Sequence, residues 1–298
     1  MAGPVVALKI DVDTYAGTRD GVPRLLDILE RSGITATFYF SMGPDNSGKA
    51  IRRIFSRRGY LHRLLRMKGV ATVHLKTMLY GTILPPPLIA DSFPGILRET
   101  EKRGHEVGTH SWDHVKWDDL LPWFPMPVTA MELGRASSAF ERIFGRRART
   151  TAAPGWTVSP DSLEIQDAMG LDYCSDSRGS HPFYPSMGGR SFRTLQIPTT
   201  WPTVDEVIGE NGITRANVND HYLSLLRPGL NVHTVHAEIE GGGLADTFAD
   251  LLQRLRQEGV RFVTLGEAVA EFGPDAPECV IEMGTLPGRA GAAAIQIN

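Results

Sequence analysis

The chain of 298 residues has very little cysteine and no long hydrophobic run. Its two cysteines are Cys174 and Cys279, so we expect no disulfide framework, and a reducing cytosol suits the sequence. A membrane-spanning helix needs about 18 or more consecutive apolar residues, and the sequence contains no such run. The first residues lead into an apolar segment without the charged region and cleavage site of a secretory signal, so none is expected.

Acidic residues are absent from Asn46 to Ala90, although the whole chain carries 34 of them. Nine of the 31 basic residues fall in that stretch, which leaves 22 basic residues against 34 acidic ones elsewhere. Its apolar residues, among them Ile51, Phe55, Leu61 and Leu65, recur at roughly helical spacing between arginines. Such a basic amphipathic segment is typical of proteins that bind an anionic membrane surface. A helical insertion that packs on the protein and exposes its charges to water fits the same pattern.

Strand-like and helix-like segments alternate along most of the chain. The strand-like runs are 5–10, 35–40, 105–109, 148–153, 171–175, 194–198, 230–236 and 260–264. The helix-like segments are 22–32, 93–103, 130–144, 160–169, 217–226 and 244–258. This alternation predicts an α/β fold with a parallel sheet, and seven or eight units favour a barrel. We expect one barrel domain over residues 1–272, with the basic amphipathic insertion at about 46–92, and a flexible tail at 273–298 that is rich in Ala, Gly and Pro.

Polar side chains follow two of the predicted strands. Asp11 and Asp13 should point the same way, because side chains two apart on a strand share a face. His110 and His114 follow the run 105–109 and, four residues apart, can share one face of a helical turn. Two imidazoles and a carboxylate can hold a divalent metal, and a spare carboxylate can then take a proton from its water. The same ligand set occurs in non-haem iron oxygenases, although the spare carboxylate favours hydrolysis.

Two other strand ends carry titratable residues. His236 ends the run 230–236 and is a candidate general acid, because the ordinary pKa of histidine lies near neutrality. Asp176 follows the run 171–175 and could orient His236 or a substrate amine, although a simple turn aspartate explains it equally well. His233 should point to the opposite face of its strand, and we expect it to be structural.

In this order, these residues resemble the motifs of the polysaccharide deacetylase family with the NodB homology domain. The resemblance implies that Asp11 is the catalytic base and that Asp13, His110 and His114 are the metal ligands. It also implies catalytic roles for Asp176 and His236, which are similar to residues of the fourth and fifth family motifs. The family fold, a distorted (β/α)7-type barrel, is therefore the fold expected for this chain.

The third family motif is only partly present. The family usually has an arginine two residues before a proline, where this chain has Ala152-Ala153-Pro154. In the family that arginine orients the catalytic base, so the resemblance leaves open which residue steadies Asp11. Arg178 and Arg19 are the candidates that we consider.

Longer strings resemble the family branch that deformylates 4-deoxy-4-formamido-L-arabinose-phosphoundecaprenol for lipid A modification and polymyxin resistance. They include Ile10–Thr14, Phe40–Asn46, Asp205–Gly209 and His236–Gly241. The resemblance implies an amide hydrolase with one divalent metal (Zn, Co, Mn or Fe), a lipid-linked sugar substrate and no nucleic acid partner. It further implies a cytoplasmic protein, peripheral on the inner face of the membrane through residues 46–90. Deacetylation of another N-acyl sugar or polysaccharide, and a membrane-associated binding protein with an inactive site, remain as alternatives.

Overall fold

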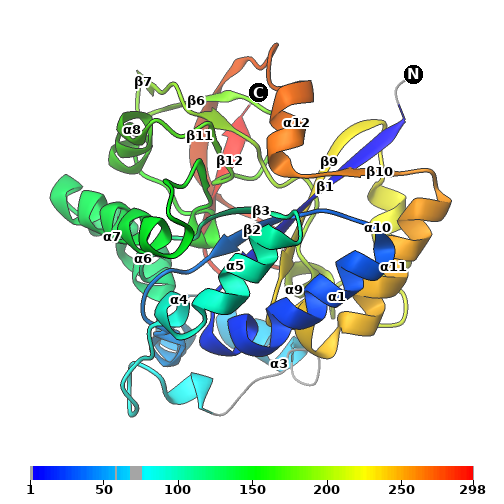
Figure 1. The fold of residues 1–298 in the computed structure, drawn as a ribbon, viewed down its shortest axis with the longest axis horizontal. Helices are drawn as coiled ribbons and strands as arrows, with labels where there is room; N and C mark the ends of the chain where they lie inside the picture. Colours follow the sequence, from blue (N-terminus) through cyan, green and yellow to red (C-terminus); the bar gives the residue numbers. More distant parts are fainter. Residues whose placement is uncertain (1–2, 58, 68–75, 298) are drawn as a thin grey trace.

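The fold is built around a curled parallel sheet, seen in a computed structural model that describes residues 3–57, 59–67 and 76–297 (Figure 1). The strand pairings of this sheet are all parallel. Its strands are β1 (Pro4–Val12), β2 (Thr37–Phe40), β3 (Glu106–Thr109), β4 (Thr150–Thr151), β5 (Tyr173–Cys174), β8 (Leu195–Gln196), β9 (Gly229–His236) and β10 (Arg261–Val263).

β1 is the strand around which the sheet curls. On one edge it pairs with β9 along most of its length, which places Asp11 opposite His236. On the other edge it pairs first with β10 and then with β2, from which the sheet continues through β3, β4 and β5 to β8. Beyond β8, the backbone N–H of Thr200 donates to Val232 of β9 at 3.0 Å, so the curled sheet nearly closes on itself. This architecture confirms the predicted distorted (β/α) barrel.

Helices cover the outside of the sheet (Figure 1). The longer ones are α1 (Val22–Ser32), α5 (Pro94–Lys102), α7 (Met126–Phe144), α8 (Pro160–Met169), α10 (Val218–Leu225), α11 (Ala245–Gln257) and α12 (Leu265–Phe272). Shorter ones are α6 (His114–Leu120), α9 (Val204–Val207), η4 (Leu121–Trp123) and η5 (Pro154–Trp156). Two π-helical turns, η1 (Gly17–Gly21) and η6 (Ile239–Gly243), join β1 to α1 and β9 to α11.

The alternation of side chains along β1 separates the hydrophobic core from the site. Val6, Leu8, Ile10 and Val12 face the helices and belong to the largest cluster of buried apolar residues. The opposite face carries Val5, Ala7, Lys9 and Asp11 in that order. The interior of the barrel is therefore apolar at the amino end of β1 and polar at its carboxyl end, where the site lies.

The prediction of a flexible tail at 273–298 was wrong for most of its length. Residues Glu278–Thr285 form β11 and Ala292–Ile297 form β12, an antiparallel pair. With β6 (Tyr184–Met187) and β7 (Arg190–Ser191) they make a second sheet. The alanines that suggested a loose segment are small buried residues of a strand, because Ala293 and Ala294 are fully covered.

Within the residues that the structure describes, the basic stretch forms several short helices rather than one long amphipathic helix. They are η2 (Ser47–Arg52), α2 (Arg53–Ser56), α3 (Tyr60–Arg66), η3 (Thr77–Leu79) and α4 (Ile89–Ser92). Two basic residues of the predicted insertion, Arg58 and Lys68, lie outside the described residues. In the part of the chain that the structure describes, no helix is long and apolar enough to cross a bilayer.

The arginines of this insertion pair largely with acidic residues of the barrel. Arg53 lies 2.8 Å from Asp118, and Arg63 pairs with the buried Asp205. Arg57 pairs with Asp118, and Arg66 pairs with Glu210. Much of the positive charge is therefore neutralised within the protein, which the sequence pattern did not indicate.

Candidate active site

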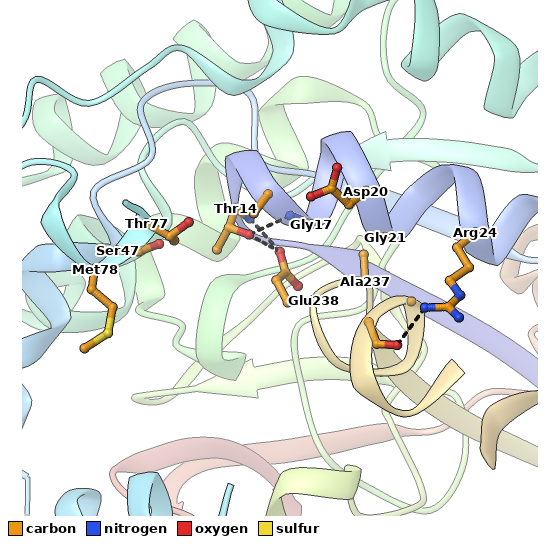
Figure 2. A pocket seen from close by; sticks show the side chains of 13 residues that line it. Thr14, Gly17, Asp20, Gly21, Arg24, Ser47, Thr77, Met78, Ala237 and Glu238 are labelled. Carbon is orange, nitrogen blue, oxygen red and sulfur yellow. Dashed lines mark hydrogen bonds between the residues drawn. The ribbon is translucent and has the colours of Figure 1, made fainter. Parts of the chain in front are cut away.

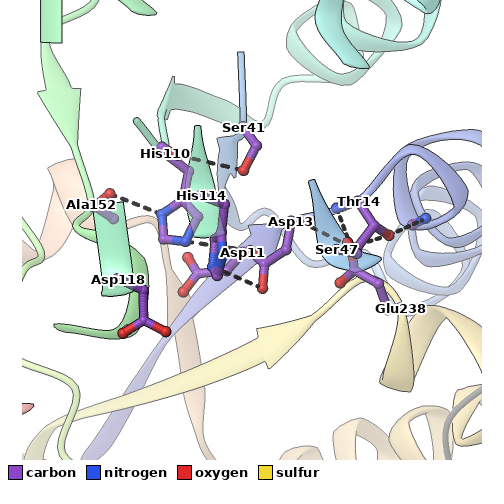
Figure 3. Close-up of polar contacts among 12 residues, drawn as sticks. Asp11, Asp13, Thr14, Ser41, Ser47, His110, His114, Asp118, Ala152 and Glu238 are labelled. Atoms are coloured by element: carbon purple, nitrogen blue, oxygen red, sulfur yellow. Dashed lines mark hydrogen bonds and ion pairs between the residues drawn. The ribbon is translucent and has the colours of Figure 1, made fainter. Parts of the chain in front are cut away.

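Asp13, His110 and His114 meet at the carboxyl ends of the central strands (Figure 3). Asp13 follows β1, His110 follows β3, and His114 is the first residue of α6. The Nε2 atoms of His110 and His114 lie 3.3 Å from Asp13 Oδ1 and Oδ2, respectively. Ligands about 2.1 Å from a metal in tetrahedral geometry lie about 3.4 Å apart, so this spacing fits a metal ion.

The ring of His110 is oriented by the backbone of the third-motif segment. Its Nδ1 lies 2.8 Å from the carbonyl oxygen of Ala152, which selects the tautomer with hydrogen on Nδ1. Nε2 then directs a lone pair toward Asp13 Oδ1, which is buried and has no hydrogen-bond partner in the described part of the chain. Two facing acceptors repel each other unless a cation lies between them, so the donor set fits a metal.

The sequence predicted that the two histidines share a helical turn. The turn between them is not helical, because only His114 lies in α6. Ser111 has a left-handed backbone with φ of 61°, a conformation that costs energy for a residue other than glycine. Asp113 caps α6 by accepting the backbone N–H of Lys116 at 3.0 Å, and it also accepts from Asn46 Nδ2 at 2.6 Å. Helix capping and a sharp turn together bring the two imidazoles to one side.

Electrostatics favour an ionised Asp13. Burial raises its pKa, but the neighbouring His114 and His110 outweigh burial and hold the pKa well below its usual range. The loop that carries Asp13 is fixed by Glu238, whose Oε1 accepts from the backbone N–H groups of Asp13 and Thr14 at 2.9 and 2.7 Å. Gly17 packs against the same carboxylate so closely that an added Cβ would lie 2.1 Å from Oε1.

A cavity of about 350 Å³ opens beside this loop (Figure 2). Thr14 and Glu238 line it, one residue along the chain from the predicted ligand Asp13 and two from His236. The turns η1 and η6 supply other parts of its wall, and Met78 of the insertion supplies another. A volume of this size suits part of a small ligand next to the proposed metal.

Asp11 lies beside the predicted metal ligands (Figure 3), and it is almost completely buried. Its Oδ2 lies 3.2 Å from Nζ of Lys9, and its Oδ1 has no hydrogen-bond partner among the described residues. Neither arginine that we considered as its support contacts it in the described structure. Arg178 pairs with Glu206 at 2.8 Å, and the exposed Arg19 pairs with Asp20 at 2.6 Å.

His236 stands next to Asp11 because β9 and β1 pair in register there. Its backbone N–H donates to Glu240 Oε2 at 2.9 Å. Burial raises the pKa of Asp205, but Arg63 and then His236 outweigh burial and lower it. His236 is thus close enough to Asp205 to affect the pKa of that carboxyl, a link that sequence analysis missed although the string Asp205–Gly209 had been noted.

Asp176 is not brought to His236. It is fully buried, and it accepts hydrogen bonds from Gln166 Nε2 at 2.9 Å and Gln196 Nε2 at 3.2 Å. In the described part of the chain it forms no hydrogen bond or ion pair with His236. Burial raises the pKa of Asp176 above its ordinary value, and the two glutamines only partly offset this effect. These contacts support a structural role for Asp176, which is to hold the two glutamine side chains beneath the site.

Comparison with known proteins agrees with this geometry. The model of the polysaccharide deacetylase family matches residues 1–174, which carry Asp11, Asp13, His110 and His114. The chain belongs to the polysaccharide deacetylase family. With its deacetylase family and its deformylase relatives, the chain is a hydrolase acting on a linear carbon–nitrogen amide bond.

Two relatives in the polysaccharide deacetylase family match nearly the whole chain. One, from Shewanella sediminis, is a probable 4-deoxy-4-formamido-L-arabinose-phosphoundecaprenol deformylase, 36% identical over 96% of this chain and 92% of its own. Another of the same name, from Wigglesworthia glossinidia brevipalpis, is 32% identical over 94% of this chain and 98% of its own. A putative polysaccharide deacetylase from Mycobacterium smegmatis has the same fold, with a TM-score of 0.63, 18% identity and coverage of 95% and 96%.

Proposed function

We propose that this deacetylase-family enzyme removes the formyl group from undecaprenyl-phosphate-linked 4-deoxy-4-formamido-L-arabinose, giving formate and the lipid-linked amino sugar. The observation that carries the proposal is the metal-type cluster of Asp13, His110 and His114 beside a carboxylate, Asp11, with an unpartnered oxygen. The choice of substrate rests on the two relatives of that name, which match the chain almost from end to end.

The residues divide the work of amide hydrolysis between them. A divalent metal held by Asp13, His110 and His114 would lower the pKa of a bound water and polarise the amide oxygen. Asp11 Oδ1 accepts the proton of the attacking water, since this oxygen has no other described partner. His236, opposite Asp11, donates a proton to the leaving amine.

The general acid can be tested separately from the metal ligands. We expect His236→Ala to keep its metal and to lose about 10²–10⁴-fold in kcat, the usual contribution of a general acid. The measurements are formate release and metal content on the same preparation. A variant with unchanged kcat would exclude His236 from proton transfer.

The cavity in Figure 2 is the proposed place for the part of the substrate next to the reacting amide. Thr14, Glu238 and Arg24 line it, and Glu238 also accepts the backbone N–H of Asp13, the proposed metal ligand. Arg24 is exposed and donates to the carbonyl oxygen of Gly242 at 3.3 Å, a long contact that an anionic group can replace.

The deciding experiment measures formate release from the synthetic lipid-linked formamido sugar, with and without a chelator. We expect turnover to be lost with the chelator and restored by Zn²⁺, Co²⁺, Mn²⁺ or Fe²⁺. Comparing the restored rates shows which of these metals supports the reaction best. The acetamido analogue tests the acyl group, because one extra methyl in a small pocket costs about 1–3 kcal/mol. Equal rates on both substrates would favour a general deacetylase, and oxygen consumption would favour an oxygenase.

We further propose that the insertion attaches the enzyme to the inner face of the cytoplasmic membrane. Several of its apolar side chains point into solvent, notably Phe55, Leu65 and Ile83, which are 91%, 61% and 77% exposed. Arg52 and Lys76 are exposed in the same segment and would face anionic headgroups. The segments that carry them lie along the lower margin of Figure 1.

Vesicle sedimentation tests this attachment. We expect the wild type to sediment with vesicles that contain anionic phospholipid, and Phe55→Ser with Leu65→Ser to weaken that binding several-fold, because apolar burial is lost. Val280→Ser, which changes a 45% exposed apolar residue of β11, is the matched control. Equal losses in the control and the test variant would contradict attachment through the insertion.

A further inference from the structure

Lys9 is an inward-facing residue of β1, two residues before Asp11, and it is fully buried. Its Nζ donates to the carbonyl oxygen of Ser175 at 3.1 Å and lies 3.2 Å from Asp11 Oδ2. The same atom lies 5.1 Å from the ring centroid of Trp156, within the range of a cation–π contact. Lysine is almost never fully buried unless it is paired, so these three contacts mark a specific position.

The two oxygens of Asp11 have different surroundings. Oδ2 faces Lys9, whereas Oδ1 is buried without a hydrogen-bond partner among the described residues. The terminal torsion of an aspartate is broad, so a carboxylate with no contact at either oxygen has no fixed direction. The ion pair at Oδ2 therefore determines where Oδ1 points.

Other side chains that could hold Asp11 are engaged elsewhere or lack the chemistry. The buried Arg178 pairs with Glu206, and Arg19 pairs with Asp20 on the surface. At the third motif, the buried Ala152 has no polar side-chain atom and offers its carbonyl oxygen to His110. Within the described residues, Lys9 is the basic side chain that forms an ion pair with Asp11.

We propose that Lys9 is the positioning residue for Asp11: it holds Oδ2 so that Oδ1 receives the proton of the attacking water. This proposal rests on the proposed hydrolytic function, because that proton transfer belongs to the reaction. In the described structure Lys9 forms no ion pair or hydrogen bond with Asp13, His110 or His114. Its loss should therefore lower kcat and leave the metal content unchanged.

The first test uses the full chain loaded with Zn²⁺ and compares Lys9→Met, Asp11→Asn and the double variant. We expect Lys9→Met to lose about 10²-fold in kcat, the cost of a misplaced reacting group, with KM changed by less than about threefold. In the Asp11→Asn background the same substitution should have no further effect on kcat. Unchanged kcat in Lys9→Met, or fully additive losses in the double variant, would overturn the proposal.

The second test needs no substrate. In a crystal structure of Lys9→Met, we expect the Asp11 carboxylate to rotate or to occupy two orientations, while Asp13 and both histidines keep theirs. A single, unchanged orientation of Asp11 would refute the role of Lys9. If Lys9→Met does not fold, Lys9→Gln replaces it under the same criteria. A wild type that releases no formate contradicts the proposed function, whereas the crystallographic result still decides the question of Lys9.

Discussion

The strand ends of the barrel and the interface of the insertion bury carboxylates in two different ways. At the strand ends, Glu238 and Glu240 accept hydrogen bonds from backbone N–H groups, and burial raises the pKa of each to about 8. At the interface, Asp118 and Asp205 face arginines, which outweigh burial and lower their pKa values. A carboxylate next to a cation stays ionised, whereas a buried carboxyl that meets neutral donors keeps its proton to a higher pH.

The same contrast corrects the simplest interpretation of the basic stretch. Its charge suggested an external anionic partner, yet Arg53, Arg57, Arg63 and Arg66 all pair with acidic residues of this chain. Two of these ion pairs end on Asp118, which lies on the helix that begins with His114. The insertion is thus anchored to the site through its arginines, and it presents apolar side chains to solvent.

The largest effect is expected from a change at the strand ends. We expect His114→Ala to abolish metal-dependent formate release and to lower metal affinity, because one of three protein ligands is removed. Metal content after dialysis and formate release are the two measurements. Full turnover in this variant would show that the cluster at the strand ends is not the site of reaction.

An intermediate effect is expected from the interface. Arg63→Gln leaves the buried Asp205 without its cation, which should destabilise the fold by about 1–3 kcal/mol, less than for a fully buried pair because Arg63 is 28% exposed. Urea unfolding measures the loss, and Arg52→Gln is the control because Arg52 is an exposed arginine of the same segment. Equal small losses in both variants would mean that the ion pair with Asp205 does not anchor the insertion.

The smallest effect is expected from protonation. The pKa of Glu240 is raised from 4.5 to about 8, mainly by burial, so the folded state keeps a proton that the unfolded state has already lost. Unfolding free energy should therefore fall as pH rises through this window, and Glu240→Gln should remove that part of the fall. Urea unfolding of both proteins at about pH 6 and about pH 9 measures the difference. Parallel pH profiles would contradict a protonated Glu240.

Sequence patterns over a few residues predicted the features that depend on neighbouring residues, such as strand faces and helix bounds. The period of a strand places Asp11 and Asp13 on one face, and the alternation of segments predicted the barrel and the bounds of α1 and α8. The partners of buried charges could not be predicted, because Lys9 and Ser175 are 166 residues apart and Arg66 and Glu210 are 144 apart. The β11–β12 hairpin was missed because an alanine-rich composition does not distinguish a loose segment from a closely packed strand.

The position of β1 has a consequence for how the chain folds. β1 is synthesised first, yet it lies between β9 and β10, and Glu238, which fixes the loop of Asp13, comes 225 residues later. Arg289 of the segment before β12 also donates to Gly155 at the third motif, across 134 residues. Contacts so distant in sequence form slowly and late. The ribosome must therefore release nearly all of the described chain before the hydrolytic site can assemble, which couples the onset of activity to the completion of the fold.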